Sequence, residues 1–469
     1  NIYKGKKPLK AMPCTYVEAE NEATTLEIKL FDNVINVELM IYYTIFESYG
    51  VIARSVSFLN LGEENLYLNI AMSASLDLPD DNYEMIHLAG AWARERYVKT
   101  RKLQPGVQAI HSIRGSSSSN HNPFIALKRP ETTENFGEVY GFSLVYSGNF
   151  LAQVEVDSYG TSRICIGINP FNFSWNLKKQ EIFQTPEAVL VYSDRGLNAM
   201  SQTFHKLYRT RLARGYWRDR IRPILINNWE ATYFDFNEDK ILSLAKVAKE
   251  LGIELFVLDD GWFGKRNGDN SSLGDWYPNL EKLPKGISGL SKKINALGLD
   301  FGLWFEPEMV NADSHIFEEH PKWVIYTSER RMSQGRNQYV LDFSRKDVVD
   351  YVFNMIDKVI YNTSISYIKW DMNRNITEAY SHGLEATRQG EFMHRYILGV
   401  YDLYNRFIIK YPKILFESCS GGGNRFDPGM LYYAPQGWVS DDTDAIERLK
   451  IQYGTSIVYP ISSIGSHVS

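Results

Sequence analysis

The chain has 469 residues, of which 44% are hydrophobic and 23% are charged, a balance typical of a soluble globular protein with a sizeable core. Its 51 basic and 56 acidic side chains leave a net charge of −5, which is too small to indicate nucleic acid or an anionic membrane surface as a partner. No segment approaches the ~18 consecutive apolar residues of a membrane-spanning helix. At about 100–200 residues per domain, the length predicts two or three domains.

The cysteines indicate the cellular compartment, and the two ends of the sequence indicate whether the chain is a portion of a longer protein. Cys14, Cys165 and Cys419 are far apart and odd in number, which fits neither a disulfide framework nor a zinc site. This usage is typical of a reducing compartment, so we expect a cytoplasmic protein. The sequence begins with Asn1, shows no signal-peptide pattern and stops at Ser469 directly after a strand-like run. We therefore expect a portion of a longer protein that lacks both ends.

Residues 1–195 are predicted to form a β domain. From Ile35 to Ile45, apolar and polar residues alternate with the period of two that is typical of a half-buried strand, and residues 66–72 repeat the pattern. Turn residues separate such runs. Many short strands without interleaved helices predict an antiparallel β-sandwich, and we find no catalytic constellation in it.

The run RGSSSSNHNPF, residues 114–124, interrupts this pattern. A flexible linker is the default interpretation of four consecutive serines. The flanking Arg, His and Pro are unlike a Gly/Ser tether, however, so an ordered loop is the alternative.

A change of pattern near Asp194 predicts a domain boundary. Residues 197–212 predict a helix, and a basic stretch then leads to Pro223. We assign residues 196–222 to a helical connector and residues 223–469 to a second domain.

The second domain alternates short apolar strands with amphipathic helices. Strands are predicted over residues 224–229, 255–260, 301–306, 367–374, 414–417 and 437–441, with a seventh over 456–464. Helices are predicted around residues 238–251, 290–297, 347–361 and 391–411. Repeated βα units predict a parallel sheet, and this many predict a (β/α)8 TIM barrel. With seven strands at most, the barrel is expected to be incomplete at its C-terminus.

Polar and aromatic side chains stand at the ends of six predicted strands. In a (β/α)8 barrel these ends meet at one face, where active sites lie. A single acidic strand end is commonly a helix cap, but six such ends are not easily explained by capping. The residues are Trp229; Asp259, Asp260 and Trp262; Trp304, Glu306 and Glu308; Lys369, Asp371 and Asn373; Glu417 and Cys419; Asp441, Asp442 and Asp444.

Carboxylates and tryptophans with a lysine and an arginine, but no His or Cys dyad, suit glycoside hydrolysis. One carboxylate acts as nucleophile or base, and a second carboxylic acid protonates the leaving oxygen. Indole rings stack on the apolar face of a sugar, and charged groups hydrogen-bond its hydroxyls. Asp259, Asp260 and Asp371 also suit Mg²⁺ or Mn²⁺. Because Lys369 and Arg336 are expected to balance these charges, we expect neither a metal nor a cofactor.

Several long motifs carry a family resemblance. The sequence resembles the α-galactosidases of glycoside hydrolase family 36, over essentially its whole length. The β-domain run RGSSSSNHNPF is also similar to that family. The matching stretches of the second domain are VLDDGWFGKRNGDNSSLGDW (257–276), LWFEPEMVN (303–311), YIKWDMNR (367–374), ESCSGGGNRFDPGML (417–431) and WVSDDTDAIERLKIQYG (438–454).

The resemblance implies roles for single residues. Asp371 in KWDMN matches the family's nucleophile, and Asp441, the first Asp of SDDTD, matches its general acid/base. Asp259 and Asp260 match the pair that holds O4 and O6 of galactose. Cys419 favours galactose, because related N-acetylgalactosaminidases carry another residue there. The other matches are Trp229 and Trp304 as pocket walls, Arg336, Lys369 and Asn373 as hydroxyl binders, and Gly422 and Arg425, which complete with Cys419 the CxxGxxR pattern beside the 2-hydroxyl.

The implied activity is hydrolysis of terminal α-galactose from melibiose- or raffinose-type oligosaccharides by double displacement with retention. Its two carboxyls are then expected about 5–5.5 Å apart, and the general acid must hold its proton near neutral pH. A galactosyl transferase, an α-N-acetylgalactosaminidase, a sugar-binding module without catalysis and a metal-dependent hydrolase are the alternatives.

One residue departs from the family pattern, and two parts of the family's fold are expected to lie outside this sequence. The family usually reads SDNTD, whereas this chain has Asp442 where Asn is expected. Family members assemble as tetramers in which a neighbour's N-terminal loop closes the pocket. That loop is expected to precede Asn1, and a C-terminal β domain is expected to follow Ser469.

Overall fold

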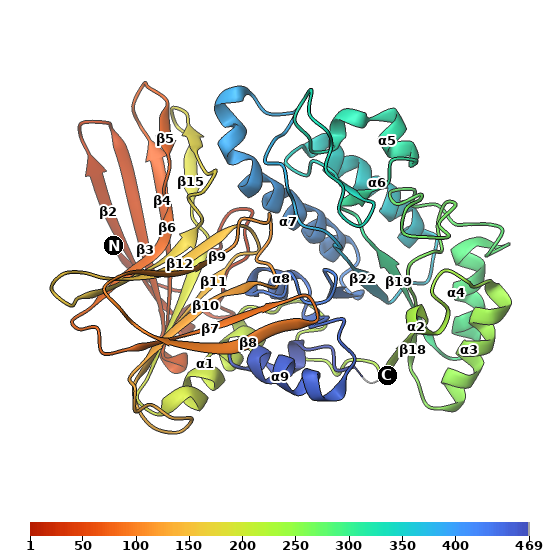
Figure 1. Ribbon diagram of the computed structural model, residues 1–469, viewed down its shortest axis with the longest axis horizontal. Helices are drawn as coiled ribbons and strands as arrows, with labels where there is room; N and C mark the ends of the chain where they lie inside the picture. The colour runs from red at the N-terminus through yellow and green to blue at the C-terminus, as the bar shows by residue number, and fades with distance from the viewer. Residues whose placement is uncertain (468–469) are drawn as a thin grey trace. The chain divides into compact units, whose positions relative to one another are not determined.

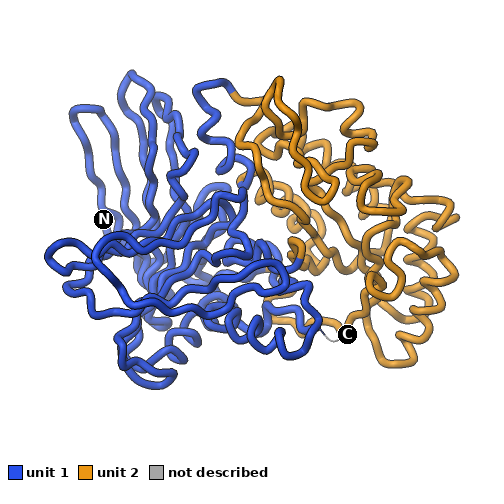
Figure 2. Tube along the Cα trace, in the orientation of Figure 1, with its two compact units in different colours: residues 1–214, 385–397, 422–469 blue, residues 215–384, 398–421 orange. Residues whose placement is uncertain are grey.

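The computed structural model describes residues 1–467, and its contacts divide it into two compact units. Unit 1 comprises residues 1–214, 385–397 and 422–469, and unit 2 comprises residues 215–384 and 398–421 (Figure 2). Contacts therefore group segments that are distant in the sequence. The sequence-domain boundaries near residues 195 and 222 stay a prediction. In the described part of the chain, no helix has the length and apolar character needed to cross a membrane.

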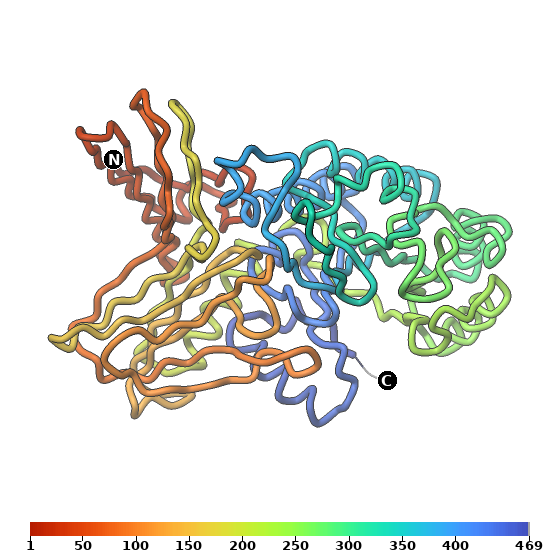
Figure 3. Tube along the Cα trace, turned by 45° about the horizontal axis from the view of Figure 1, so that its top comes forward, coloured from red at the N-terminus to blue at the C-terminus, as the bar shows by residue number. Residues whose placement is uncertain are grey.

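Unit 1 is built on antiparallel sheets. The largest sheet runs in the order β1-β2-β3-β4-β16-β11-β10-β7-β8, and β15 pairs with β4 outside this path. The β4–β5 connection and the β15 segment accordingly run side by side in Figure 3. A second sheet, β6-β13-β12-β9, contacts the first through β10 with β12 and β11 with β13, and β14 pairs with β5. The strands are β1 (Ile2–Lys4), β2 (Thr24–Asp32), β3 (Val37–Phe46), β4 (Val51–Asn60), β5 (Leu66–Leu68), β6 (Met72–Leu78), β7 (Glu84–Ala91), β8 (Arg94–Lys102), β9 (Gly106–His111), β10 (His121–Lys128), β11 (Val139–Val145), β12 (Phe150–Val156), β13 (Ser162–Ile168), β14 (Trp175–Leu177), β15 (Ile182–Gln184) and β16 (Glu187–Ser193).

The core of these sheets follows from the period of two along the strands. In β12, every second residue from Phe150 to Val156 is buried, and the residues between them are more exposed. The predicted antiparallel β fold is therefore confirmed. β3 starts at Val37 and not at Ile35, because residues 33–36 form the turn after β2, where Asn36 has a φ of +52°.

The helix α1 (Gly196–Arg211) packs its apolar side on β11 and β16. Phe204 is fully buried, and its ring meets those of Phe124 and Tyr208 at centroid distances of 5.9 and 5.7 Å. The predicted helix over residues 197–212 is confirmed to within one residue at each end.

The later segments of unit 1 are tied to its sheets by buried polar contacts. They contain η4 (Ala386–Glu391), α8 (Pro428–Tyr433), β24 (Gln436–Gly437), α9 (Ala445–Ser456) and η5 (Ile461–Ser463). Buried Glu391 accepts a hydrogen bond from the backbone N–H of Asn176 at 3.0 Å. The hydroxyl of Ser117 donates to Asp427 at 2.6 Å, and the amide of Asn122 donates to the carbonyl of Phe426 at 2.7 Å.

The serine run is thus an ordered, largely buried loop that hydrogen-bonds to a later segment of unit 1. Ser116, Ser117 and Ser118 are all buried. The linker interpretation of this run is wrong, and the alternative of an ordered loop is confirmed. A buried carboxylate needs hydrogen-bond donors, and small hydroxyls supply them in little space.

Unit 2 contains a parallel sheet with strand order β17-β18-β19-β22-β23. β18, β19, β22 and β23 are largely buried, whereas β17 is partly exposed, and helices follow the strands, so the sheet forms part of a TIM barrel as predicted. Figure 1 shows α3 and α4 side by side next to β18 and β19. The elements are β17 (Leu225–Asn227), α2 (Trp229–Thr232), α3 (Glu238–Glu250), β18 (Leu255–Leu258), α4 (Gly286–Ala296), β19 (Asp300–Phe305), β20 (Met309–Val310), α5 (His315–Glu319), η3 (Pro321–Trp323), β21 (Tyr339–Val340), α6 (Lys346–Tyr361), β22 (Tyr367–Trp370), α7 (Phe392–Lys410, which begins in unit 1) and β23 (Leu415–Ser418).

The last two predicted strands differ from the structure. The strand predicted over 437–441 is reduced to β24, Gln436–Gly437. The seventh strand, predicted over 456–464, is wrong: α9 runs to Ser456, and Ile464 alone makes an isolated parallel bridge, to Gly437. The apolar residues of this run are buried in the core of unit 1, where they need no sheet pairing, and Pro460 lacks the N–H that a strand would use.

We expect Phe204→Ala to destabilise the protein by about 3–5 kcal/mol, because it removes a fully buried ring between Phe124 and Tyr208. Chemical denaturation followed by tryptophan fluorescence measures the change. Phe171→Ala is the control, since that ring is 57% exposed and its loss should change stability little. Equal effects of the two substitutions would contradict the assigned packing.

Candidate active site

Nine of the twelve predicted site residues lie in unit 2 and three in unit 1. The unit 2 set is Trp229, Asp259, Asp260, Trp304, Arg336, Lys369, Asp371, Asn373 and Cys419, and the unit 1 set is Gly422, Arg425 and Asp441. Within unit 2, most of these residues follow the C-terminal ends of neighbouring parallel strands, as the barrel prediction requires.

Asp371, directly after β22, is held by four N–H donors. Its Oδ1 accepts from the backbone N–H groups of Met372 at 2.8 Å and Gly421 at 3.0 Å. Its Oδ2 accepts from Asn373 Nδ2 at 2.8 Å and from the indole of Trp304 at 3.2 Å. The carboxylate is buried, so these bonds fix its orientation.

The same surroundings keep Asp371 ionised. Burial alone would raise its pKa, but Lys369, the N–H of Gly421, Arg336 and Asn373 outweigh burial and lower the pKa below its ordinary value. An anionic, oriented carboxylate at a strand end has the properties of a nucleophile.

Lys369 is the cation of this strand. Its ammonium lies 2.9 Å from Asp259 Oδ2, which also accepts from Asn227 Nδ2 at 2.5 Å. Burial lowers the pKa of Lys369, but Asp259, Cys419 and Asp371 raise it well above the ordinary value. Lys369 is therefore a permanent positive charge between two carboxylates.

Asp260 has a partner that the sequence analysis missed. Arg266 binds both of its carboxylate oxygens, at 2.9 and 2.7 Å, and both side chains are buried. Burial raises the pKa of Asp260 above its ordinary value although Arg266 opposes this. Arg266 lies six residues after Asp260, inside the same sequence motif. This closeness in the sequence could have indicated the ion pair.

These ion pairs also address the metal alternative for Asp259, Asp260 and Asp371. Asp259 is paired with Lys369 and Asp260 with Arg266. Within residues 1–467, no group of three or more His, Cys, Asp or Glu side chains is arranged to hold a metal ion. Asp259 and Asp260 are therefore each balanced by a protein cation.

Arg336 and Cys419 are two further predicted site residues of unit 2. Arg336 has a φ of +52°. Burial lowers the pKa of Arg336, but Glu306, Asp371 and Asp260 outweigh burial and raise it above the ordinary value. Cys419 is buried, and its backbone N–H donates to the carbonyl of Trp370 at 2.7 Å.

The two tryptophans predicted as pocket walls differ in their surroundings. Trp304 is buried, and its ring stacks on Phe263 at 6.2 Å and meets Trp276 at the same distance. It supports Asp371 through its N–H. Trp229 begins α2 and is only partly buried, with Tyr233 and Phe234 at its edge.

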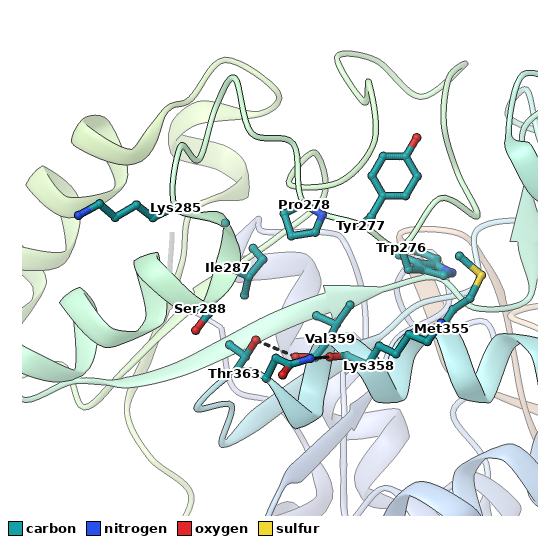
Figure 4. A pocket seen from close by; sticks show the side chains of 12 residues that line it. Trp276, Tyr277, Pro278, Lys285, Ile287, Ser288, Met355, Lys358, Val359 and Thr363 are labelled. Atoms are coloured by element: carbon teal, nitrogen blue, oxygen red, sulfur yellow. Dashed lines mark hydrogen bonds between the residues drawn. The ribbon is translucent and has the colours of Figure 1, made fainter.

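A cavity of about 470 Å³ lies elsewhere in unit 2 (Figure 4). It is lined by the loop before α4, by the start of α4 and by the C-terminal half of α6, including Trp276, Lys285 and Lys358. None of the predicted site residues lines it, so we assign it no part in the chemistry.

Glu306 is a second carboxyl group beside Asp371, and the sequence analysis gave it no role. It is fully buried, and it accepts from the backbone N–H of Asn373 at 2.5 Å and from Gln338 Nε2 at 3.0 Å. Burial and the charge of Asp371 raise the pKa of Glu306 to about 8. Glu306 is therefore protonated at neutral pH, in contrast to Asp371.

In unit 1, Asp441 is an exposed carboxylate between two indoles. Trp92 donates to its Oδ2 and Trp438 to its Oδ1, each at 3.0 Å. Gly422, with φ +79°, has no room for a side chain, because a Cβ there would lie 2.8 Å from the backbone nitrogen of Asp441. Arg425 is buried and is close enough to Asp427 to affect its pKa.

Trp92 belongs to the β domain, to which the sequence analysis assigned no catalytic residue. It lies in the turn between β7 and β8, and 60% of its surface is exposed. An exposed tryptophan in a hairpin turn is unusual, but the exposure and the turn are seen only in the structure.

Comparison with known proteins places the chain in a family. A family model described as Melibiase matches residues 182–469, and one described as glycosyl hydrolase family 36 N-terminal domain matches residues 1–178. The chain belongs to glycosyl hydrolase family 36. The predicted resemblance is thereby confirmed.

Two curated relatives are similar to this chain over its whole length. Alpha-galactosidase AgaA of Geobacillus stearothermophilus is 60% identical and Alpha-galactosidase Mel36A of Lactobacillus acidophilus 50% identical, over 468 residues and 100% of this chain in both cases. A crystal structure of an AgaA variant in complex with raffinose is 59% identical with a TM-score of 0.99, and the match covers 100% of this chain and 65% of that one. This chain spans 64% of the length of AgaA and of Mel36A.

Glu306 makes stability depend on pH in a defined direction. Its pKa is about 8 in the folded protein against an ordinary 4.5, so the folded state holds a proton that the unfolded chain releases. This contribution to stability is complete below about pH 4.5 and is lost as the pH rises through about 8. In Glu306→Gln, whose amide is neutral throughout, the thermal midpoint should fall less over this range than in the parent.

Glu318→Gln is the control for that measurement, because Glu318 is exposed and should leave the pH dependence unchanged. Parallel curves for the parent and Glu306→Gln would contradict a protonated Glu306.

The departure from the family pattern at Asp442 has a structural explanation. Asp442 Oδ1 accepts the backbone N–H of Asp444 at 2.8 Å, in the turn before α9. An Asn side chain has an equivalent oxygen. We therefore expect the pH–rate profile of Asp442→Asn to keep the alkaline limb of the parent. A displaced limb would show that the Asp442 charge acts on the neighbouring Asp441.

Proposed function

We propose that this family 36 protein is a retaining α-galactosidase that releases terminal non-reducing α-D-galactose from oligosaccharides such as melibiose and raffinose. The strongest support is Asp371, a buried carboxylate that four N–H donors orient and that its surroundings keep ionised. The names of AgaA and Mel36A, and the raffinose complex of AgaA, support the substrate class.

In the proposed reaction, Asp371 attacks the anomeric carbon while protonated Asp441 donates its proton to the leaving oxygen. The C1–O bond to the leaving group breaks as the bond from C1 to the Asp371 oxygen forms. Asp441, now ionised, takes a proton from water, whose oxygen displaces Asp371 from C1. Two inversions give retention, and this mechanism requires the two carboxyls about 5–5.5 Å apart.

The other polar groups of the site are proposed to bind galactose. Asp259 and Asp260 suit O4 and O6, because Lys369 and Arg266 hold both as oriented acceptors. Cys419, Gly422 and Arg425 are assigned to the 2-hydroxyl. Trp229, Arg336 and Asn373 complete the set of sugar-binding positions.

We further propose a cytoplasmic homotetramer for the full-length protein. Cys14, Cys165 and Cys419 are not joined to one another by disulfides, which suits a reducing compartment. Exposed apolar side chains on the β2–β3 hairpin, among them Leu30, Phe31 and Val34, offer surface for subunit contacts. Light scattering on the full-length protein measures the assembly, and a monomer would contradict this proposal.

Release of nitrophenol from 4-nitrophenyl α-galactoside tests the function. We expect Asp371→Ala in the full-length protein to lose at least roughly 10³-fold in kcat. Added azide should restore turnover of this variant and give β-galactosyl azide, because the azide ion fits the space of the missing nucleophile. Asp239→Ala, at an exposed position of α3, is the control and should keep full activity.

Two results would contradict the assignment. An α-configured azide product would show that Asp371 is not the nucleophile of a retaining mechanism. A folded parent that releases no galactose would contradict the hydrolase itself, and product analysis at high sugar concentration separates hydrolysis from galactosyl transfer.

A further inference from the structure

The carboxylate of Asp441 is exposed, yet both of its oxygens are engaged. Trp92 Nε1 donates to Oδ2 and Trp438 Nε1 donates to Oδ1, each at 3.0 Å. An exposed aspartate without such partners is free to rotate about its side-chain bonds. Two planar donors from different segments of the chain restrict it to one orientation.

The turn that carries Trp92 is fastened to the segment that carries Asp441. Buried Arg96, in β8, donates to the carbonyl oxygens of Gly423, at 2.9 Å, and of Val439. Its Nε donates to the hydroxyl of Thr455 at 2.8 Å. Because Val439 stands two residues before Asp441, the hairpin and the Asp441 loop cannot shift independently.

Two further contacts make this connection specific. Buried Glu95 accepts from the N–H groups of Ala93 and Gly423, both at 3.3 Å. Arg96 has a φ of +57° and Ala93 a φ of +61°, both in the left-handed region that non-glycine residues rarely adopt. The strained backbone residues of the hairpin thus lie next to Trp92 and include Arg96. This indicates that the hairpin conformation is maintained for the contacts of these two side chains.

Trp438, the second indole donor to Asp441, is held by contacts with His467 and Arg448. Its ring lies edge-on to that of His467 at 4.8 Å, and the guanidinium of Arg448 lies 5.6 Å from its centroid. Arg448 also donates to the carbonyl oxygens of Ser440 at 3.2 Å and Asp442 at 2.9 Å, on either side of Asp441. The backbone around Asp441 is therefore fixed as well as its side chain.

We propose that Trp92 and Trp438 are positioning residues for the general acid/base, and that the β7–β8 hairpin contributes Trp92 as a working part of the catalytic machinery. This inference rests on the proposed role of Asp441. The two indole N–H groups orient the carboxyl group toward the leaving oxygen.

If the two indoles position Asp441, loss of either N–H should lower the cleavage rate by an amount that depends on the leaving group. The leaving oxygen of a sugar must be protonated as the bond breaks, because an alkoxide is a poor leaving group. Cleavage of raffinose therefore needs a well-placed Asp441. 2,4-Dinitrophenolate is a stable anion and leaves without a proton. Loss of an indole donor should therefore slow cleavage of raffinose and spare cleavage of 2,4-dinitrophenyl α-galactoside.

The test uses Trp92→Phe and Trp438→Phe in the full-length protein, since phenylalanine keeps an aromatic ring and removes the N–H. We expect kcat/KM for raffinose to fall roughly ten-fold or more, as for loss of a hydrogen bond to a charged group. For the dinitrophenyl substrate kcat/KM should change less than roughly three-fold. Trp217→Phe, which removes an exposed indole bond to the carbonyl of Lys413, is the matched control and should leave both values unchanged.

Equal losses on both substrates, or no loss on either, would overturn the proposal, because a packing or sugar-contact role does not distinguish leaving groups. A parent that cleaves neither substrate would overturn the proposed function instead. The crystal structure of Trp92→Phe tests the positioning independently of activity. We expect Asp441 to leave its present rotamer there, and an unchanged carboxylate would overturn the proposal.

Discussion

Unit 2 depends above all on the burial of ionised carboxylates next to cations and N–H donors. Asp371 stays an anion in a buried site because four N–H groups and the charge of Lys369 replace the water it has lost. Without these partners the carboxylate would take up a proton and lose its nucleophilicity. The strand ends must therefore deliver Lys, Asn and Trp together with Asp, and this explains why polar residues replace apolar ones there.

Two neighbouring carboxyl groups show how far the surroundings decide the chemistry. Asp371 and Glu306 follow neighbouring strands, and both accept bonds from the Asn373 residue. Asp371 has a lowered pKa, whereas that of Glu306 is raised to about 8 because it is buried and meets the charge of Asp371. The neutral Glu306 orients Asn373 without adding a third negative charge beside Asp259 and Asp371.

Unit 1 orients the Asp441 side chain with two indole N–H donors and a fixed backbone. Arg96 places a buried guanidinium among carbonyl oxygens, and Trp92 and Trp438 bind the exposed carboxylate. Small hydroxyls serve the same unit at Asp427, which is buried between Ser117 and Ser147. The β sheets thus supply both the shape of the loop that carries Asp441 and part of its hydrogen bonding.

Much of the fold and of the candidate site could be predicted, because periodicity and motifs are local properties. The alternation in the β domain, the helix at residues 197–212 and the parallel strands of unit 2 follow from short-range patterns. The strand ends also identified Asp259, Asp260 and Asp371. The serine run and the final apolar run were misjudged, since burial against Asp427 and in the core of unit 1 depends on residues hundreds of positions away.

The sequence by itself therefore determined the fold class, the family and the carboxylates. Only the tertiary structure decided how each carboxyl group is held and why Asp371 and Glu306 differ in charge. Trp92 and Asp441 are 349 positions apart, and Lys369 and Asp259 are 110 apart, so no local pattern can reveal these pairs. A pKa depends on burial and on neighbours in space, and both come into being when the chain folds.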